Sequence, residues 1–171
     1  MDPAETQTLL FTYLERSAVE LLSDVGAGFA PTEASDWMPD ITAILGFAGT
    51  GIAGSVALCT SAACLTALAQ LGQTKMSEDW LGELSNQLVG RFKRRLSPHG
   101  ASFSLGTPVV VLGERLRLAA RDARKRSLAI CLESSIGRVE IWLEIEFRDG
   151  FALSPQPEAD GSLIEGEALL F

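Results

Sequence analysis

The hydrophobic positions between residues 79 and 97 recur at the spacing of an amphipathic helix. At about 100° per residue, one side of this helix carries large apolar side chains: Leu81, Leu84, Leu88 and Phe92. The opposite side carries residues spaced four, three and four apart: Asp79, Glu83, Asn86 and Gly90. The pattern predicts a helix that buries one face and exposes a carboxylate and an amide one turn apart. Ser97-Pro98 ends it.

This helix contains residues that weaken it. Gly82, Asn86 and Gly90 lie within nine residues. A glycine inside a helix costs about 1 kcal/mol relative to alanine, and asparagine competes for hydrogen bonds with its own backbone. An exposed polar face is most often only solvated surface. Two interpretations therefore stay open: a plain solvent-facing side, or a side kept for function at some loss of stability.

Apolar patterns elsewhere predict a second long helix and several strands. The second helix covers residues 4–26 and ends at glycines. Strands are expected at 41–47, 52–60, 101–105, 109–112, 128–132 and 139–147, with a helix at 62–71. The last strand alternates clearly, with one apolar face: Val139, Ile141, Leu143, Ile145 and Phe147.

The order of these elements indicates the fold class. It is not the regular alternation of strand and helix found in parallel sheets. We therefore expect an α+β fold of two layers, a mainly antiparallel sheet with long helices packed on one face. A single domain is expected over residues 1–150, followed by an acidic, proline-containing C-terminal tail over 151–171.

Two apolar, glycine-containing stretches each match the pattern of a different structure, a membrane span and a dinucleotide-binding loop. Residues 41–74 carry no charge and are long enough to span a bilayer, but glycines divide them into strand-like pieces, so no membrane span is expected. Residues 49–54 match the dinucleotide-binding pattern GxGxxG. That pattern requires a helix directly after it, whereas a strand follows here, so the glycines are interpreted as a hairpin turn.

Charge and composition exclude several classes of function. The net charge of −8 argues against nucleic acid or an anionic membrane as the main partner. Three cysteines without a CxxC pair and a single histidine, His99, predict neither a zinc site nor a disulfide framework. His99 is expected at the end of the 79–97 helix. No signal peptide is recognisable, so the cytoplasm is the expected compartment.

The basic residues Arg91, Lys93, Arg94 and Arg95 form a cluster near the end of the same helix. Two interpretations are equally compatible with this cluster. It can stabilise the negative end of the helix dipole, or it can steer an acidic partner protein toward Glu83 and Asn86.

One combination of motifs resembles a known family. Asp79, Glu83 and Asn86 are followed, after 21 intervening residues, by Pro108 within the sequence Thr-Pro-Val-Val-Val-Leu-Gly. Upstream, residues 44–58 form a glycine-linked strand pair. Over about residues 5–148 the chain resembles the CheC/CheX/FliY family of chemotaxis phosphatases, in particular its CheX-like branch. The interval from Asn86 to Pro108 is one residue shorter than in the family pattern.

The resemblance implies a function in two-component signalling. The 79–93 helix would insert into the active site of a phosphorylated response regulator, a receiver domain, and act as an aspartyl-phosphate phosphatase, a hydrolase. Asn86 would orient the attacking water and Glu83 would pair with the regulator's lysine. Asp79, Gly90 and Lys93 would contact the partner. The chain would need no cofactor or metal of its own, because Mg²⁺ would belong to the regulator.

The resemblance also implies a homodimer, with strand 139–147 as the candidate edge for pairing. Two other functions on the same fold stay open: a non-catalytic module that binds a response regulator, and a purely structural dimerisation protein. The arginine-rich connection 113–126 and the acidic tail match nothing in the family core.

Overall fold

The alternating and helical patterns of the sequence fold into one antiparallel sheet with helices against one of its faces. The computed structural model of the protein describes residues 1–34, 36–74, 78–113, 116, 126–148 and 150–155. Within them, the strands are β1 (Ala30–Thr32), β2 (Ile41–Gly49), β3 (Ile52–Thr60), β4 (Phe103–Leu105), β5 (Val109–Leu112), β6 (Arg126–Ser134) and β7 (Gly137–Phe147). The helices are α1 (Pro3–Asp24), α2 (Ala62–Leu71), α3 (Glu78–Leu96) and the short 3₁₀ helix η1 (Ser97–His99).

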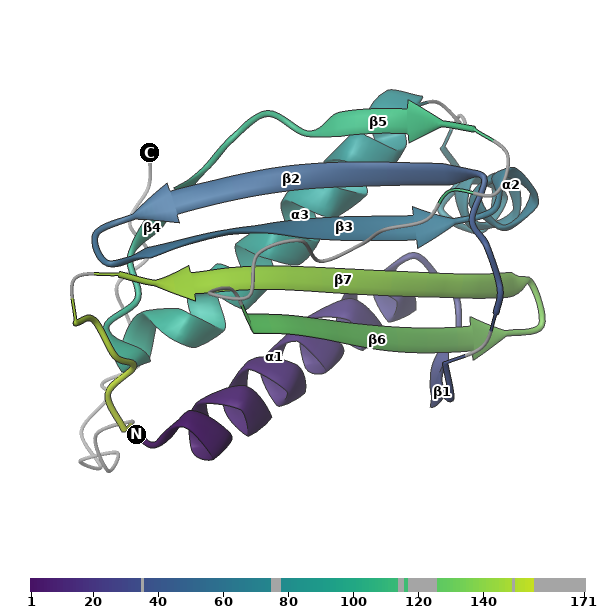
Figure 1. The fold of residues 1–171 in the computed structure, drawn as a ribbon. Coiled ribbons are helices and arrows are strands. Elements are labelled where there is room, and N and C mark those ends of the chain that lie inside the picture. Colours follow the sequence, from purple (N-terminus) through teal and green to yellow (C-terminus); the bar gives the residue numbers. More distant parts are fainter. Residues whose placement is uncertain (35, 75–77, 114–115, 117–125, 149, 156–171) are drawn as a thin grey trace, which may run out of the picture.

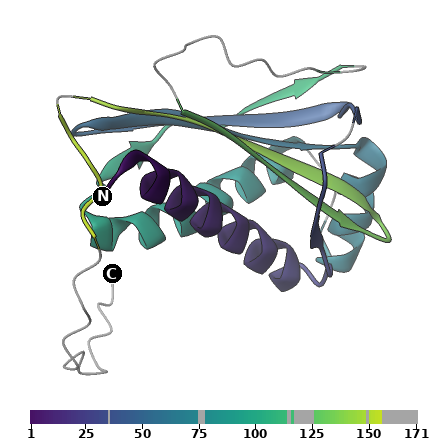
Figure 2. The same ribbon diagram turned by 60° about the horizontal axis from the view of Figure 1, so that its bottom comes forward.

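The sheet has the order β1-β6-β7-β3-β2-β4 (Figure 1). β5 is also paired to β2, along the same edge as β4 but toward the other end of β2. All of these pairs are antiparallel. Figure 2 shows α1 and α3 together beneath the sheet, and α2 near one end of it. The expected α+β architecture, two layers with helices on one face, is therefore confirmed.

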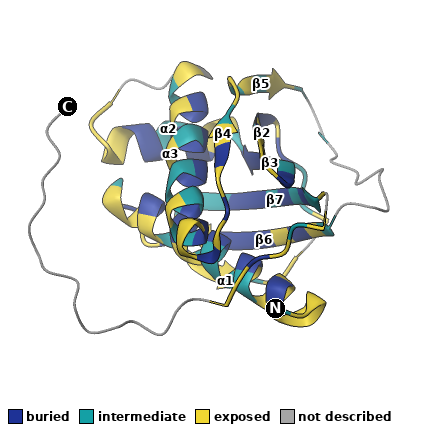
Figure 3. Ribbon diagram, turned by 90° about the vertical axis from the view of Figure 1, so that its left-hand side faces the viewer, coloured by how far each residue is buried: buried dark blue, intermediate teal, exposed yellow. Residues whose placement is uncertain are grey.

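The core lies between this helical layer and the facing side of the sheet. In β7, Val139, Ile141, Leu143 and Ile145 are each at most 1% exposed, as their alternation predicts. Phe147, at the end of the strand, is only half-buried. In Figure 3 both long helices have one buried and one exposed side. The same amphipathic patterns that predict the elements thus also decide which sides meet.

β7 lies inside the sheet and is not an edge strand, so the expectation that it pairs with a second copy is wrong. One of its sides pairs with β3 from Val139 to Phe147, and the other pairs with β6. Its backbone donors and acceptors are therefore used within the sheet. Alternation reports which side chains are buried, and it carries no information about how many neighbours a strand has.

The glycines at residues 49–54 form the β2–β3 hairpin, as predicted. Gly51 has a φ of +73°, in the region that favours glycine. A Cβ added at Gly49 would overlap the carbonyl oxygen of Ser102, and one at Gly54 would overlap that of Glu144. These glycines therefore serve a tight turn and close backbone packing. No helix in the described part of the chain is long and apolar enough to cross a membrane.

The core continues past residue 150, the expected end of the domain. Leu153 is 1% exposed, and the carbonyl oxygen of Ser154 accepts a hydrogen bond of 2.7 Å from Nδ1 of His99. Nε2 of His99 then accepts from the Tyr13 hydroxyl at 3.0 Å. His99 does follow α3, but it is 2% exposed and joins α1 to the chain after β7. Residues 156–171, and most of the 113–126 connection, lie outside the described residues.

Candidate functional site on helix α3

Helix α3 buries the face that its sequence predicts. Leu81, Leu84, Leu88 and Phe92 are between 0% and 3% exposed, and Val89 and Leu96 are also buried. The helix contacts α1, β2 and β5. Because this apolar side is held against the sheet and α1, the rotation of α3 about its own axis is determined. The polar residues on the other side are therefore presented in a defined direction.

The polar side of α3 carries the residues expected to act. Asp79 and Glu83 are exposed, while Asn86, Gly90 and Lys93 are half-buried. Glu83 and Asn86 are one turn apart, so their side chains are neighbours on the helix surface. Within the described part of the chain the Asn86 amide has no hydrogen-bond partner. An amide can donate and accept at once, and an exposed carboxylate can hold an ammonium group.

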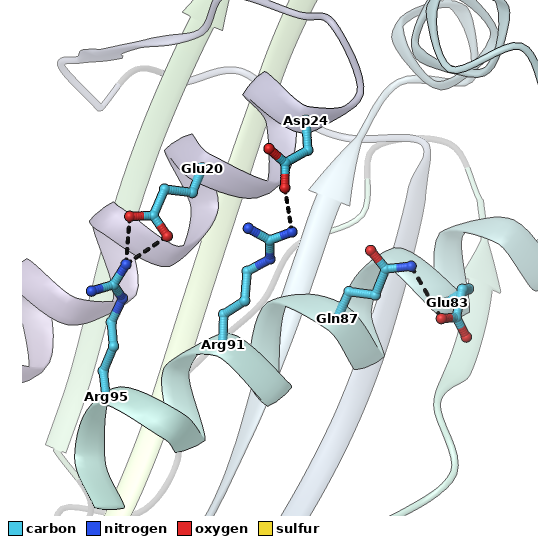
Figure 4. Close-up of polar contacts among 6 residues, drawn as sticks. All are labelled: Glu20, Asp24, Glu83, Gln87, Arg91 and Arg95. Atoms are coloured by element: carbon cyan, nitrogen blue, oxygen red, sulfur yellow. Dashed lines mark hydrogen bonds and ion pairs between the residues drawn. The ribbon is translucent and has the colours of Figure 1, made fainter. Parts of the chain in front are cut away.

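The Glu83 carboxylate has a neighbour that the sequence analysis did not single out. Nε2 of Gln87 donates a hydrogen bond of 3.1 Å to Oε1 of Glu83 (Figure 4). The two residues are four apart on the same helix, a spacing at which side chains meet. This four-residue spacing is the sequence signal that could have identified Gln87 as a contact of Glu83. The contact leaves Oε2 of Glu83 for another donor.

Two glycines of α3 have different surroundings. A Cβ added at Gly82 would lie 3.2 Å from Cγ of Pro108, whereas one at Gly90 would have nothing within 4 Å. Pro108 directly precedes β5, so the structure brings this proline against the helix that carries Glu83 and Asn86. The fold thus accommodates the interval from Asn86 to Pro108, which is one residue shorter than in the family pattern. The surface around Gly90 is open to an approaching molecule.

The basic cluster is largely used inside the protein. Nη2 of Arg91 lies 2.6 Å from Oδ2 of Asp24, and Nη2 of Arg95 lies 2.5 Å from Oε1 of Glu20 (Figure 4). These ion pairs join α3 to α1. Their acidic partners are more than half exposed, so each contributes only about 0–1 kcal/mol to stability.

The other two basic residues differ from each other. Nζ of Lys93 lies 5.8 Å from the centre of the Phe103 ring, while Arg94 is exposed. Lys93, Arg94 and Arg95 occupy the last turn of α3, where positive charge is favourable. Of the four basic side chains, Lys93 and Arg94 are therefore the two that best fit the hypothesis of steering an acidic partner toward Glu83 and Asn86.

The cysteines do not offer a reactive group to this site. Cys59, Cys64 and Cys131 are buried and unbridged. Burial raises the pKa of Cys59 to about 12, with a further contribution from the negative charge of Glu140. Its thiol therefore stays protonated at neutral pH. Within the described residues no group of three or more His, Cys, Asp or Glu side chains is placed to hold a metal ion.

A family model described as "Chemotaxis phosphatase CheX" matches residues 41–132 of the chain. These residues include β2, β3, all of α3 and Pro108. The chain belongs to the CheX family. The family assignment covers the β2–β3 hairpin, the helix with Glu83 and Asn86, and the two strands β4 and β5 after it.

Solved structures share the fold of this CheX-family chain. The chemotaxis protein CheX from Vibrio vulnificus aligns with a TM-score of 0.72 and 19% identity over 80% of this chain and 99% of that chain. A CheC-like superfamily protein from Shewanella sp. PV-4 aligns with a TM-score of 0.72 and 20% identity over 85% of this chain and 99% of that chain.

A third structure contains a partner. It is a CheX-CheY-BeF3-Mg²⁺ complex from Borrelia burgdorferi, which aligns with a TM-score of 0.63 and 15% identity over 80% of this chain and 97% of that chain. At these identities the alignments demonstrate a common fold. No curated protein matches the chain.

Proposed function

We propose that this CheX-family protein hydrolyses the aspartyl phosphate of a response regulator, using the exposed side of α3. The observation that carries this proposal is that an exposed carboxylate, Glu83, lies one turn from the amide of Asn86 on a helix whose apolar side is buried. The Asn86 amide has no hydrogen-bond partner among the described residues. The open surface at Gly90 leaves room for a partner to approach the same side. An exposed helix face with open space beside it suits insertion into another protein's active site.

The chemistry requires little more than placement of a water molecule. The Asn86 amide accepts a hydrogen bond from the water and directs its oxygen at phosphorus, opposite the aspartate oxygen. The new P–O bond forms as the bond to aspartate breaks, which releases inorganic phosphate and restores the carboxylate. Glu83 pairs with a lysine of the regulator and so holds the two proteins in register. Mg²⁺ bound to the regulator would neutralise charge on the phosphoryl group.

The Borrelia complex supports the choice of partner. That CheX-family protein was solved bound to CheY, with BeF3 and Mg²⁺ present. By analogy, we assign a receiver domain as the partner of this chain and Mg²⁺ as the partner's ion. Asp79, Gly90 and Lys93 then belong to the contact surface, because they lie on α3 beside the acting pair.

We further propose a homodimer formed through a sheet edge other than β7. Among the described strands β5 is paired only to β2, and it exposes Val109 and Leu112 at 60% and 57%. An apolar edge strand of this kind is a template for pairing with another chain. The cytoplasm remains the proposed compartment, since three unbridged cysteines suit a reducing environment.

The test is phosphate release from purified, phosphorylated receiver domains of the same organism. We expect acceleration by the wild-type protein and a loss on the order of 10²-fold in kcat for Asn86→Ala, by analogy with the removal of one positioned polar group elsewhere. Glu83→Ala should mainly weaken complex formation. Gln70→Ala removes an exposed amide on α2 and serves as the matched control.

Two outcomes would reject the proposal. If both Asn86→Ala and Glu83→Ala release phosphate as fast as wild type, α3 is not the acting element. If the wild-type protein binds a phosphorylated receiver domain without accelerating phosphate release, the protein is a binding module on the same fold.

A further inference from the structure

A groove of about 360 Å³ lies between α1 and the first half of β6. β6 contributes Leu128 to this groove. The wall on α1 consists of residues three, four and seven positions apart, which share one exposed side of the helix: Ala4, Gln7, Thr8 and Phe11. Phe11 leaves 40% of its surface exposed there. The described residues that line the groove include none from α3, so the groove is separate from the proposed phosphatase site.

The strand that borders the groove has a free edge in its first half. β1 pairs with β6 at Cys131, Leu132 and Glu133. Over residues 126–130, the described strands give β6 a partner on the β7 side alone. Every second residue of this stretch directs its N–H and C=O groups away from β7. Such an edge can bind an additional strand through backbone hydrogen bonds, while a neighbouring groove takes the side chains of alternate residues.

The two faces of β6 determine which side chains an added strand needs. Leu128 and Ile130 are 7% and 2% exposed on the face that meets the helices. Ser127 and Ala129, on the opposite face, are exposed. Because side chains of neighbouring strands follow the same alternation, an added strand needs apolar side chains at every second position, beside Leu128 and Phe11. The positions between them can carry charge.

A segment with this pattern occurs in the same chain, at residues 163–171. Its sequence is Leu-Ile-Glu-Gly-Glu-Ala-Leu-Leu-Phe. In an extended segment, every second residue from 164 onward lies on one side, and none of these residues is charged: Ile164, Gly166, Ala168 and Leu170. Both acids of the segment, Glu165 and Glu167, fall on the other side. The alternation therefore matches what the free edge of β6 requires.

The described chain ends close to the groove. Ser154 is hydrogen-bonded to His99, and the ring of His99 contacts Tyr13 of α1. In Figures 1 and 2 the yellow end of the described chain lies beside the N-terminal end of α1, where the groove begins. Nine extended residues, from 155 to 164, span up to about 30 Å, whereas Ala4 and Phe11 are about 10 Å apart along the helix axis. The segment is therefore long enough to enter the groove from this end.

We propose that residues 163–171 bind in the groove between α1 and β6 as an additional strand of the sheet, with their uncharged side against Phe11 and Leu128. The segment is tethered to the domain, so its effective concentration at the groove is on the order of millimolar, and a modest interaction is enough to fill the groove. The bound segment covers the exposed ring of Phe11 and the free edge of β6. It thereby prevents this edge from pairing with a second copy of the chain.

The experiment is hydrogen–deuterium exchange of the full chain, measured by mass spectrometry on its peptides. We expect the amides of residues 163–170 to exchange at least about tenfold more slowly than those of a free peptide with the same sequence, because a hydrogen-bonded amide exchanges only when its strand opens. Binding within one chain does not depend on protein concentration, so the protection should be equal over an about hundredfold range of concentration.

Variants on both sides of the contact assign the groove. Phe11→Ala removes the exposed ring from α1, and Leu170→Asp places a charge on the uncharged side of the segment. Each should abolish most of the protection of residues 163–170, which is a change of about tenfold. Phe11 is exposed and alanine is a good helix former, so Phe11→Ala should fold as wild type does. Ala159→Asp introduces the same charge before the alternating segment and is the matched control, with protection unchanged.

Four results would overturn this inference. Residues 163–170 could exchange as fast as the free peptide, or their protection could be unchanged in Phe11→Ala. Protection that increases with protein concentration would assign the groove to a second copy. Loss of protection over residues 117–125, and not over 163–170, in Phe11→Ala would assign the groove to that connection. None of these measurements uses a receiver domain or phosphate release, so their outcome is independent of the proposed phosphatase function.

Discussion

Replacing Gly90 and Gly82 of α3 by alanine separates helix propensity from packing. Alanine is favoured over glycine inside a helix by about 1 kcal/mol. At Gly90 an added Cβ meets nothing within 4 Å, so Gly90→Ala should gain this full amount. At Gly82 the Cβ would lie 3.2 Å from Cγ and 3.6 Å from Cβ of Pro108. The first contact is tighter than ordinary van der Waals packing, and the strain should cancel most of the gain.

The measurement is urea unfolding followed by far-UV circular dichroism. With a urea dependence on the order of 2 kcal/mol/M, Gly90→Ala should raise the unfolding midpoint by about 0.5 M, and Gly82→Ala should leave it almost unchanged. Ala67→Gly, inside α2, makes the reverse change and should lower the midpoint. The three variants together calibrate the effect of backbone propensity in this protein.

Equal stabilisation by the two variants would show that Pro108 does not pack against α3. A Gly90→Ala variant that is no more stable than wild type would show that its surroundings are not open. The first result would also remove the contact that brings the proline of the family motif to the helix. If Gly90→Ala is more stable but slower in phosphate release, the glycine is retained for partner access at some loss of stability.

Three further predictions concern other parts of the molecule. The pKa of Cys59 is raised to about 12 by burial, so its contribution to stability is present below the unfolded pKa of about 8.5 and is lost as the pH rises toward 12. Urea unfolding of wild type should therefore show a steeper loss of stability over that range than Cys59→Ala, and equal slopes would contradict this. Gln87→Ala removes the hydrogen bond to Glu83 and should raise KM about two- to fivefold at unchanged kcat, whereas a fall in kcat alone would assign Gln87 another role. Val111→Lys, at a position of β5 that is 36% exposed, should convert a homodimer to a monomer in light scattering; a wild-type monomer, or a variant that still dimerises, would reject pairing through β5.

Local periodicity was enough to predict most elements and the two sides of α3. The 3.6-residue repeat of Leu81, Leu84, Leu88 and Phe92 predicts only that one side of a helix is buried, and the structure confirms this burial. The β2–β3 hairpin follows equally from strand patterns broken by glycines. In both cases the signal lies within a few neighbouring residues. Over such a short stretch the backbone geometry alone decides the direction in which each side chain points.

Contacts between distant residues could not be predicted in this way. The pairing of Arg91 with Asp24 spans 67 residues, and that of His99 with Ser154 spans 55. The sequence therefore left two interpretations of the basic cluster open, and it placed His99 at the helix end without indicating that this side chain is buried. β7 resembled an edge strand for the same reason, since its hydrogen-bonded neighbours come from other parts of the chain.

The candidate sites show the same division. The placement of Glu83 and Asn86 on one side of α3 was set by spacing along a single helix, because a helix turns by a constant angle per residue. The contact of Pro108 with Gly82 and the hydrogen bond from Gln87 to Glu83 emerged only with the fold and its side-chain positions. The cavity on the sheet face opposite the helices, which Trp37, Glu140 and Trp142 line, depends entirely on tertiary structure. Its walls are about a hundred residues apart in sequence, and only the packing of the segment before β2 across β7 brings them together.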